Sequence, residues 1–274
     1  MPSPPSPMQF KSKKQKDKRV FLSFCFLLNL FINHQINADK PIEPISTDRP
    51  TFSDSPITVP KDSIQLENGI IYKHFPKEDD SIALPETLIR YGLSERLEFR
   101  LTTPNLLLLG DSLSELEASD LSLGAKIKLG PLPGKVEAAV VLGSSLPSGN
   151  KGVSSGSVDP FLRLSASKSL SSKTSLSGSL NFSWPRVDSE REFVFQPALA
   201  FIVSPNSKFS LFMDYSSEIP TYGETIHYIR PGLIFLPRPK QQLDIYCGVA
   251  LSSELSNVFL GAGYSFRIDG VFGH

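Results

Sequence analysis

The stretch ISTDRPTFSDSP, residues 45–56, gathers side chains that could do chemistry. It places Asp48, Arg49 and Asp54 among prolines and hydroxyl groups. Two carboxylates beside a guanidinium are compatible with a cation site, a catalytic loop or a polar spacer. The choice among these three depends on the elements that follow, because a side chain acts only where the fold holds it.

Histidines are the other candidates for catalysis, and after the N-terminal segment they stand at positions 74, 227 and 274. A Ser–His pair would suit a lipase working at a membrane rim. Serines are so frequent that such a pairing carries no information, and no orienting motif surrounds His74 or His227. No spacing of His, Cys and Asp matches a known metal site. We therefore predict no catalytic residue, no metal and no cofactor, and keep an enzyme acting on lipid as an alternative.

At its N-terminus the sequence has the layout of a secretory signal peptide. Six basic residues precede an apolar run of 13 residues, VFLSFCFLLNLFI, and Ala38 is a suitable cleavage point. A membrane anchor is the alternative, but 13 helical residues span only about 20 Å of a hydrocarbon core about 30 Å thick. The pattern predicts export with residues 1–38 removed. Because MPSPPSP is an unusual beginning for a signal, Met1 and Met8 both stand as candidate starts.

The composition of the exported part excludes one class of partner. The 274 residues carry no formal net charge, and removal of residues 1–38 takes away six basic residues and one acidic residue, which leaves about −5. Such a balance gives no reason to expect nucleic acid as a partner. Cys247 is the cysteine that remains, so the exported chain cannot rely on an internal disulfide.

After Pro60 apolar and polar residues alternate in short stretches, which is the period-two pattern of strands with two unlike faces. In TSLSGSLNFSW, Leu176, Leu180 and Trp184 share one face, and serines fill most of the other. The stretches LSLGAKIKL and NVFLGAGYSFRI repeat the pattern. The same criterion predicts about twelve strands, at 63–75, 81–91, 96–103, 120–129, 135–146, 160–168, 174–184, 192–203, 208–217, 225–236, 241–251 and 257–268.

The connections between these strands alternate in length. GLSER, GPLPG, LSSK, PNS and PRPK are tight turns, whereas Pro104 to Ser119 and PSGNKGVSSGSVD are long. Short turns on one side and long loops on the other, with an even strand count, are typical of an outer-membrane barrel. A soluble sandwich or a lipocalin-like barrel is the alternative. Aromatic residues near strand ends on the apolar face favour the membrane: Tyr72, Trp184, Phe193, Tyr215 and Phe266.

The predicted fold is therefore all-β, a transmembrane antiparallel up-and-down barrel of about twelve strands over residues 62–274. Residues 1–38 form the signal peptide in this organisation. Residues 39–61 form a periplasmic segment between the signal and the barrel. The expected location is the outer membrane of a Gram-negative cell.

Four stretches resemble a family of bacterial outer-membrane barrels: ISTDRPTFSDSPITVPKDSIQLENGIIY, LPETLIRYGLSERLEFRL, DLSLGAKIKL and VVLGSSLPSGN. Members of that family are commonly labelled transporters, and it is related to proteins named for the meta-cleavage pathway of phenol degradation. The resemblance is strongest over residues 45–149. It implies outer-membrane placement and passage of small molecules, with hydrophobic or aromatic compounds among the candidates. The end FRIDGVFGH departs from barrels that finish on an aromatic residue, so Phe266 or Phe272 would serve as the assembly signal.

If the apolar face meets lipid, the opposite face lines a lumen with charges of both signs. We predict a channel for small molecules that works by passive or facilitated diffusion; the alternatives are the lipid-acting enzyme and a structural or surface-interaction barrel. The expected partners are outer-membrane lipids, a small permeant and the barrel assembly machinery. The lumen candidates are Glu67, Arg90, Glu98, Arg100, Lys126, Lys128, Glu137, Arg163, Asp214, Asp244 and Arg267.

A charge cluster is predicted at the periplasmic mouth, where Glu95 and Arg96 of the GLSER turn adjoin Arg90, Glu98 and Arg100. Rings of charged side chains can select permeants, so the cluster is either a constriction or a set of ion pairs that braces the barrel.

The opening stretch precedes the first strand and therefore lies on the periplasmic side, and its prolines oppose regular pairing. Asp48, Arg49 and Asp54 are within reach of the charged mouth. We predict that residues 41–60 fold against or into the lumen as a plug or latch; a disordered lead-in is the alternative.

Overall fold

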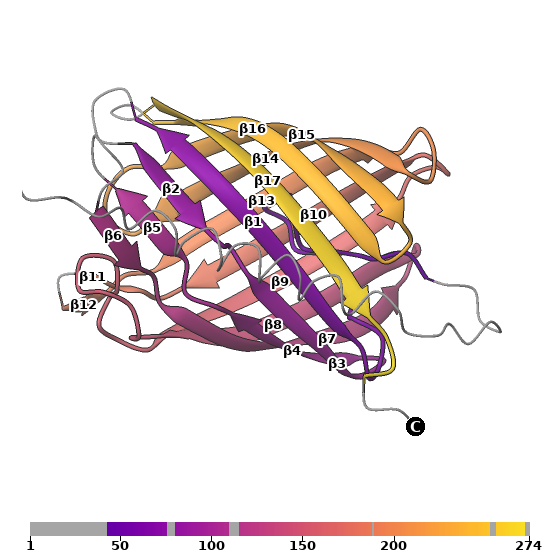
Figure 1. Ribbon diagram of the computed structural model, residues 1–274, viewed down its shortest axis with the longest axis horizontal. Helices are drawn as coiled ribbons and strands as arrows, with labels where there is room; N and C mark the ends of the chain where they lie inside the picture. The colour runs from indigo at the N-terminus through magenta and orange to yellow at the C-terminus, as the bar shows by residue number, and fades with distance from the viewer. Residues whose placement is uncertain (1–42, 76–79, 110–114, 188, 253–255, 272–274) are drawn as a thin grey trace, which may run out of the picture. The chain divides into compact units, whose positions relative to one another are not determined.

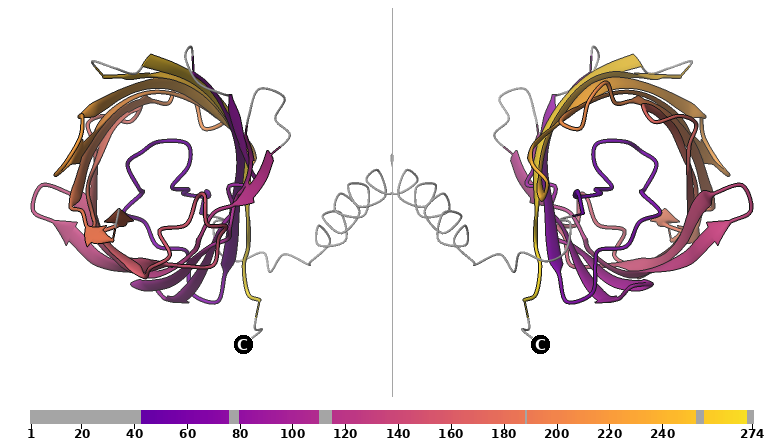
Figure 2. Two further views of the ribbon diagram at one scale, coloured as in Figure 1. Left: turned by 90° about the vertical axis from the view of Figure 1, so that its left-hand side faces the viewer. Right: turned by 90° about the vertical axis from the view of Figure 1, so that its right-hand side faces the viewer.

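Alternation of apolar and polar residues produces a closed ring of antiparallel strands (Figures 1 and 2). The computed structural model describes residues 43–75, 80–109, 115–187, 189–252 and 256–271. The predicted signal peptide, both candidate starts, Phe272 and His274 lie outside the described residues. Within them, no helix is long and apolar enough to span a membrane.

The strands follow one another around the wall, and β17 pairs back onto β1 from Ile64 opposite Ile268 to His74 opposite Val258. Their bounds are β1 (Ile64–His74), β2 (Ser81–Leu84), β3 (Leu88–Ser94), β4 (Leu97–Thr102), β5 (Leu106–Leu109), β6 (Glu115–Ala118), β7 (Leu121–Leu132), β8 (Val136–Leu146), β9 (Asp159–Ser169), β10 (Thr174–Ser183), β13 (Val194–Val203), β14 (Phe209–Pro220), β15 (Ile226–Arg238), β16 (Gln241–Leu251) and β17 (Ser256–Ile268). A separate two-stranded hairpin joins β11 (Arg186–Val187) to β12 (Glu190–Arg191).

Three positions in the wall are each built from two consecutive strands: β2 with β3, β4 with β5, and β6 with β7. Pro85 interrupts the first position and Pro104 the second, since proline cannot donate a ladder hydrogen bond. The pairing between the first and second positions continues across both interruptions, with Leu88 opposite Thr102 and Leu84 opposite Leu106. The described wall therefore has twelve positions, which confirms the predicted barrel.

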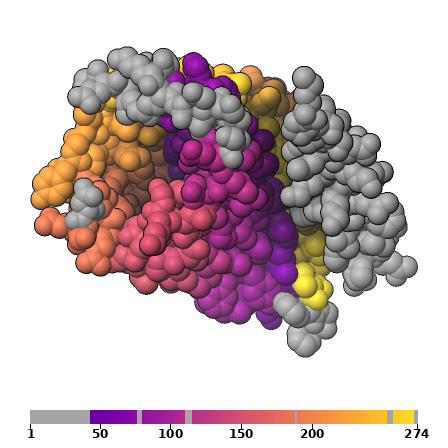
Figure 3. Space-filling view, turned by 60° about the vertical axis from the view of Figure 1, so that its left-hand side comes forward, coloured from indigo at the N-terminus to yellow at the C-terminus, as the bar shows by residue number. Residues whose placement is uncertain are grey.

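The extension formed by β5 and β6 lies in the connection that the sequence predicted as a long loop. Leu106–Leu109 pairs with Glu115–Ala118 and continues the wall past the end of β8. The apolar run at Leu106–Leu109 has no alternation, so the period-two criterion passed over it. In the space-filling view of Figure 3 the magenta part of the chain, which includes β6 and β7, forms part of the molecular surface.

Polar side chains are buried inside the ring and large apolar side chains are exposed outside it. Gln65, Glu67 and Lys126 are almost inaccessible, whereas Phe99, Leu199 and Ile245 each expose more than half of their surface. This arrangement inverts that of a soluble protein, because the apolar outer surface needs lipid to cover it. Tight turns join the strands at one end of the ring, where β1 begins and β17 ends; longer connections lie at the other end.

Candidate functional site

Residues 43–60, here called the lumen segment, lie inside the ring of strands (Figure 2). The segment enters and leaves at the short-turn end. At its start, the Ile45 amide donates to the carbonyl of Pro239 at 2.7 Å, and Arg267 Nη2 donates to the carbonyl of Glu43 at 2.8 Å. At its end, the Val59 amide donates to Glu98 Oε2 at 2.8 Å. The segment is thus a loop held at both ends by the wall.

Asp48 of the lumen segment completes a buried charge cluster. Its carboxylate lies 2.5 Å from Arg100 Nη1, 2.9 Å from Lys126 Nζ and 3.6 Å from Arg90 Nη1. Arg90 also pairs with two wall carboxylates, Glu67 at 2.9 Å and Glu98 at 2.8 Å. Three carboxylates therefore face three cations, and the cluster is balanced only while Asp48 is docked.

The pKa of Asp48 reports this balance. Burial raises the pKa of the carboxyl, but the charges of Arg100, Arg90 and Lys126 outweigh burial and hold the pKa well below its ordinary value. Asp48 is therefore ionised wherever the segment is docked at neutral pH. Its ionised form also accepts the Ser55 amide at 2.9 Å, which ties the two arms of the segment together.

Arg49 enters a notch made by two glycines. A Cβ atom at Gly69 would lie 2.1 Å from Arg49 Nη1, and one at Gly263 would lie 2.5 Å from Arg49 Nε, so larger residues would displace the guanidinium. From this notch Arg49 pairs with Glu86 at 2.9 Å and with Asp244 at 3.4 Å. The notch fixes the segment against β1 and β17.

The deepest part of the lumen segment is Phe52. Its ring lies 3.9 Å from the guanidinium carbon of Arg230 and 5.2 Å, between centroids, from the ring of Tyr228. Its amide donates to Asp214 Oδ2 at 2.9 Å, and that oxygen pairs with Arg230 at 2.8 Å. These contacts attach the tip of the segment to β14 and β15 by a cation–π interaction and a charged hydrogen bond.

The wall brings most of the predicted lumen residues to this segment. Asp54, the third charged residue of the opening stretch, pairs with Arg163 at 3.3 Å and with Arg100 at 3.8 Å. Lys128 and Glu137 pair with each other at 3.3 Å and not, among the described residues, with the segment. The segment is in direct hydrogen-bond or ion-pair contact with Glu67, Arg90, Glu98, Arg100, Lys126, Arg163, Asp214, Asp244 and Arg267.

Two members of the predicted mouth cluster are not part of it. Glu95 and Arg96 have exposed side chains at the turn between β3 and β4. The pairing there shifts by one residue between Gly92 and Ser94, so the turn residues leave the inward face. The backbone of Glu95 does contribute, since its carbonyl accepts the Thr58 hydroxyl at 3.0 Å.

Sequence reasoning missed Arg230, Glu86 and the aromatic contacts of Phe52. Arg230 is buried and inward-facing, but it precedes Pro231, and the alternation of that stretch is irregular. The excess of acidic over basic residues among the predicted inward positions of β14 and β16, Asp214 and Asp244, was the available signal that a cation was missing there.

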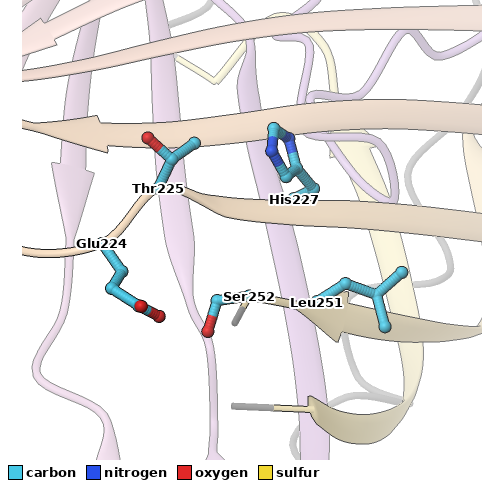
Figure 4. Close-up of a pocket in the computed structure, with 5 residues that line it drawn as sticks. All are labelled: Glu224, Thr225, His227, Leu251 and Ser252. Atoms are coloured by element: carbon cyan, nitrogen blue, oxygen red, sulfur yellow. The ribbon is translucent and has the colours of Figure 1, made fainter. Parts of the chain in front are cut away.

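A second cluster lies on the outer surface of the barrel near the long-loop end. His227 Nδ1 is 2.8 Å from Tyr215 Oη and 3.0 Å from Ser217 Oγ, and Ser217 donates to Tyr215 Oη at 2.9 Å. A nearby cavity of about 460 Å³ is lined by Glu224, Thr225, His227, Leu251 and Ser252 (Figure 4). Ser217 is buried and does not line that cavity, so the serine beside the imidazole is not presented to a substrate.

The other histidine examined for catalysis, His74, is exposed at the end of β1, where its Nδ1 lies 2.8 Å from Asp80 Oδ1. Among the described residues no group of three His, Cys, Asp or Glu side chains is placed to hold a metal ion. Cys247 is a free thiol on the exposed outer face of β16.

Solved structures with the same fold are outer-membrane barrels. The chain is similar to an outer-membrane channel from Pseudomonas putida F1, with a TM-score of 0.58 and 15% identity over 77% of this chain and 97% of that one. It is also similar to the NanC porin, with a TM-score of 0.53 and 10% identity over 75% of this chain and all of the other. A monoaromatic hydrocarbon channel, CymD, matches at a TM-score of 0.45, which is too distant to inform the permeant. None of the curated protein sequences matches this chain.

The closed ring, its apolar exterior and these matches define an outer-membrane β-barrel protein. The family described as "Putative MetA-pathway of phenol degradation" matches residues 47–268, and the chain belongs to that family. The match begins within the lumen segment and ends with the last strand, so the family pattern includes Asp48, Arg49 and Asp54 together with the wall that holds them.

Proposed function

We propose that the protein is an outer-membrane channel for small molecules and that the lumen segment is its gate. The observation that carries the proposal is that residues 43–60, which are joined to β1 only by their C-terminal peptide link, are held inside the ring by noncovalent contacts of Asp48, Arg49 and Phe52 with the wall. A closed barrel can pass solutes when a segment that fills its lumen moves aside. The wall itself does not need to open.

The competing explanation of the same contacts is that the lumen segment only fills and braces the barrel. Buried ion pairs are a poor way to stabilise a barrel, because desolvation of the charges offsets much of their attraction. Replacement by apolar residues of similar volume would brace a barrel at least as well. The charges of this cluster balance only while Asp48 is docked. Such a cluster is better suited to a segment that moves between a docked and an undocked position.

The proposed transport is passive or facilitated diffusion with no chemistry of its own. Charges of both signs line the part of the lumen wall that binds the segment, which favours weak ion selectivity in the open state. His227 does not alter this proposal, since Ser217, the serine within hydrogen-bond distance of its Nδ1, is buried. Micelle assays with phospholipid would revive the enzyme alternative if hydrolysis is found and is lost in His227→Ala.

The proposal includes the route to the membrane. A signal peptide cleaved after Ala38 would export the chain, the barrel assembly machinery would insert it, and outer-membrane lipids would cover the apolar belt. Hydrophobic or aromatic compounds stand among the proposed permeants through the family's link to phenol degradation.

The test is reconstitution of purified full-length barrel in planar bilayers and in liposomes. We expect discrete conductance steps, together with swelling of liposomes in isotonic solutions of small solutes. Heat-modifiable migration on a gel checks that the barrel is folded in the same preparation. A folded barrel that gives neither conductance nor swelling would contradict the channel proposal.

A further inference from the structure

The contacts of the lumen segment are distributed unevenly around the ring. In the part of the chain that the structure describes, its hydrogen bonds, ion pairs and ring contacts end on β1, β3, β4, β7 and β14 to β17, here called the docking side, or on the turns beside them. Among the described residues, none ends on β8, β10 or β13. On β9 the contact is made by Arg163, whose side chain is more than a third exposed.

The remaining wall, formed by β8, β9, β10 and β13, is here called the serine face, and Arg163 is the residue that bonds it to the segment among the described residues. Its buried residues are all small and uncharged: Ala138, Ala139, Val141, Ser165, Ser177, Ser179, Val194, Ala198 and Ala200. Two charged residues, Glu137 and Arg163, also lie on its inward face, and both side chains are about a third exposed. The contrast with the docking side is one of chemistry and of size, since that side presents arginines, lysine and carboxylates.

Two hydroxyl groups on the serine face are buried without a hydrogen-bond partner. Ser165 is 4% exposed and Ser179 is 3% exposed, and neither Oγ atom has a bond. The neighbours Leu164 and Leu180 point outward, so these serines point into the lumen. Buried hydroxyls without partners are uncommon because such groups lose their hydrogen bonds to water and gain none in return. They are donors and acceptors with no partner in the closed state.

We propose that the permeation path opens between the lumen segment and the serine face, and that it takes small uncharged molecules with hydrogen-bonding groups. This inference rests on the proposed channel function. The charge cluster and the glycine notch hold the segment on the docking side, so the segment separates from the wall where, among the described residues, Arg163 alone binds it. Separation exposes Ser165 and Ser179 to water or to a permeant, either of which supplies the missing bonds.

Thiol accessibility tests which side of the lumen opens. In a Cys247→Ser background, Ser179→Cys places a thiol on the serine face, and Ser265→Cys is the matched control on the docking side. Ser265 is also fully buried with an unpartnered Oγ, but it lies on β17. We expect N-ethylmaleimide to modify Ser179→Cys at least ten times faster than Ser265→Cys in proteoliposomes, as read by mass spectrometry.

Modification should also lower the single-channel conductance of Ser179→Cys by more than half and leave that of Ser265→Cys unchanged. Equal rates, a faster reaction at Ser265→Cys, or modification of Ser179→Cys with no loss of conductance would overturn the proposal. If Ser179→Cys fails to fold, as judged by heat-modifiable migration, Ser165→Cys replaces it. Absence of conductance in every variant would contradict the channel function, while the two rates would still decide which side opens.

Solute flux tests the permeant class separately. Liposomes should swell faster in arabinose, which is uncharged, than in glucosamine or gluconate of similar size. Ser179→Phe, which fills the path, should reduce arabinose swelling to less than a fifth of the wild-type rate. Preference for either charged solute over arabinose would overturn the assignment to uncharged molecules.

Discussion

The docking side and the serine face of the lumen differ in how they contact the lumen segment. The docking side holds Asp48 among Arg90, Arg100 and Lys126, where each charge has a partner. The serine face makes a single ion pair with the segment among the described residues, from Arg163 to Asp54, and its buried hydroxyls at Ser165 and Ser179 have no partner. One side therefore sets where the segment sits, and the other leaves it free to move away.

The difference shows that the ion pairs in this barrel fix the position of the lumen segment more than they stabilise the fold. A buried ion pair gains little net free energy over an apolar contact, yet loss of one partner costs about 3 to 5 kcal/mol because the other charge stays buried. The docked position is thus steeply preferred over small displacements on the charged side. The serine face adds no comparable preference.

The largest effect should come from Asp48→Asn, which leaves the three cations facing two carboxylates. A loss of about 3 to 5 kcal/mol of docking free energy would shift the closed–open equilibrium by a factor of about 10² to 10⁴. Single-channel recording should show a channel that is open most of the time. Asp159→Asn is the control, because Asp159 pairs with Arg191 outside the lumen. Unchanged gating in Asp48→Asn would show that the cluster does not hold the segment.

Acid should reproduce part of this effect. The pKa of Asp48 is lower in the docked state than in the undocked state, so its contribution is complete above the ordinary aspartate value of about 4 and is lost as the pH falls through the depressed pKa. Openings should therefore stay rare from pH 7 to about pH 4 and increase below it. Glu67 and Glu98 titrate in the same cluster, so Asp48→Asn, which keeps both, should show a weaker pH dependence. An equal dependence in the variant would assign the response to the wall carboxylates.

Phe52→Ala should have an intermediate effect. It removes the ring that stacks on Arg230 and Tyr228 but leaves the charge cluster intact. Loss of about 1 to 2 kcal/mol would raise the open fraction about tenfold. Phe52→Tyr should retain the stacking and gate like the wild type. If both variants gate alike, the stacking does not contribute to closure.

Ser179→Ala should have the smallest effect, and in the opposite direction. The variant removes a buried hydroxyl that has no partner in the closed state, so the closed state is slightly favoured. The open fraction should fall by no more than about fivefold, equivalent to about 1 kcal/mol. An increase in open fraction would mean that Ser179 bonds to the segment, and the contrast between the two sides would fail.

The wall was predictable from the sequence because each strand carries its own evidence. Period-two alternation placed the strands. The alternation stops at the tight turns, for example between Leu132 and Val136 and between Arg238 and Gln241. The stretch from Pro104 to Ser119 failed this criterion, since four consecutive leucines have no alternation. Local pattern also could not show that Glu95 and Arg96 leave the inward face at a register shift.

The site was less predictable, because its contacts join residues far apart in sequence. Asp48 and Arg49 were identifiable as charges next to a charged mouth, but the partners Arg230 and Glu86 depend on which residues the closed ring brings together. The difference between the docking side and the serine face is likewise a property of the assembled barrel. Serines alternate with leucines on β10 in the sequence, and nothing local says what faces them.

The claim that the lumen segment is the gate is tested most directly by deletion of residues 43–60, with the signal peptide and residues 39–42 kept. Single-channel conductance of this variant is compared with the wild type in the same bilayers, after heat-modifiable migration has shown that both are folded. We predict a persistent conductance several times that of the wild type, with no closures to the wild-type level. A folded deletion variant with the conductance and closures of the wild type would contradict the account.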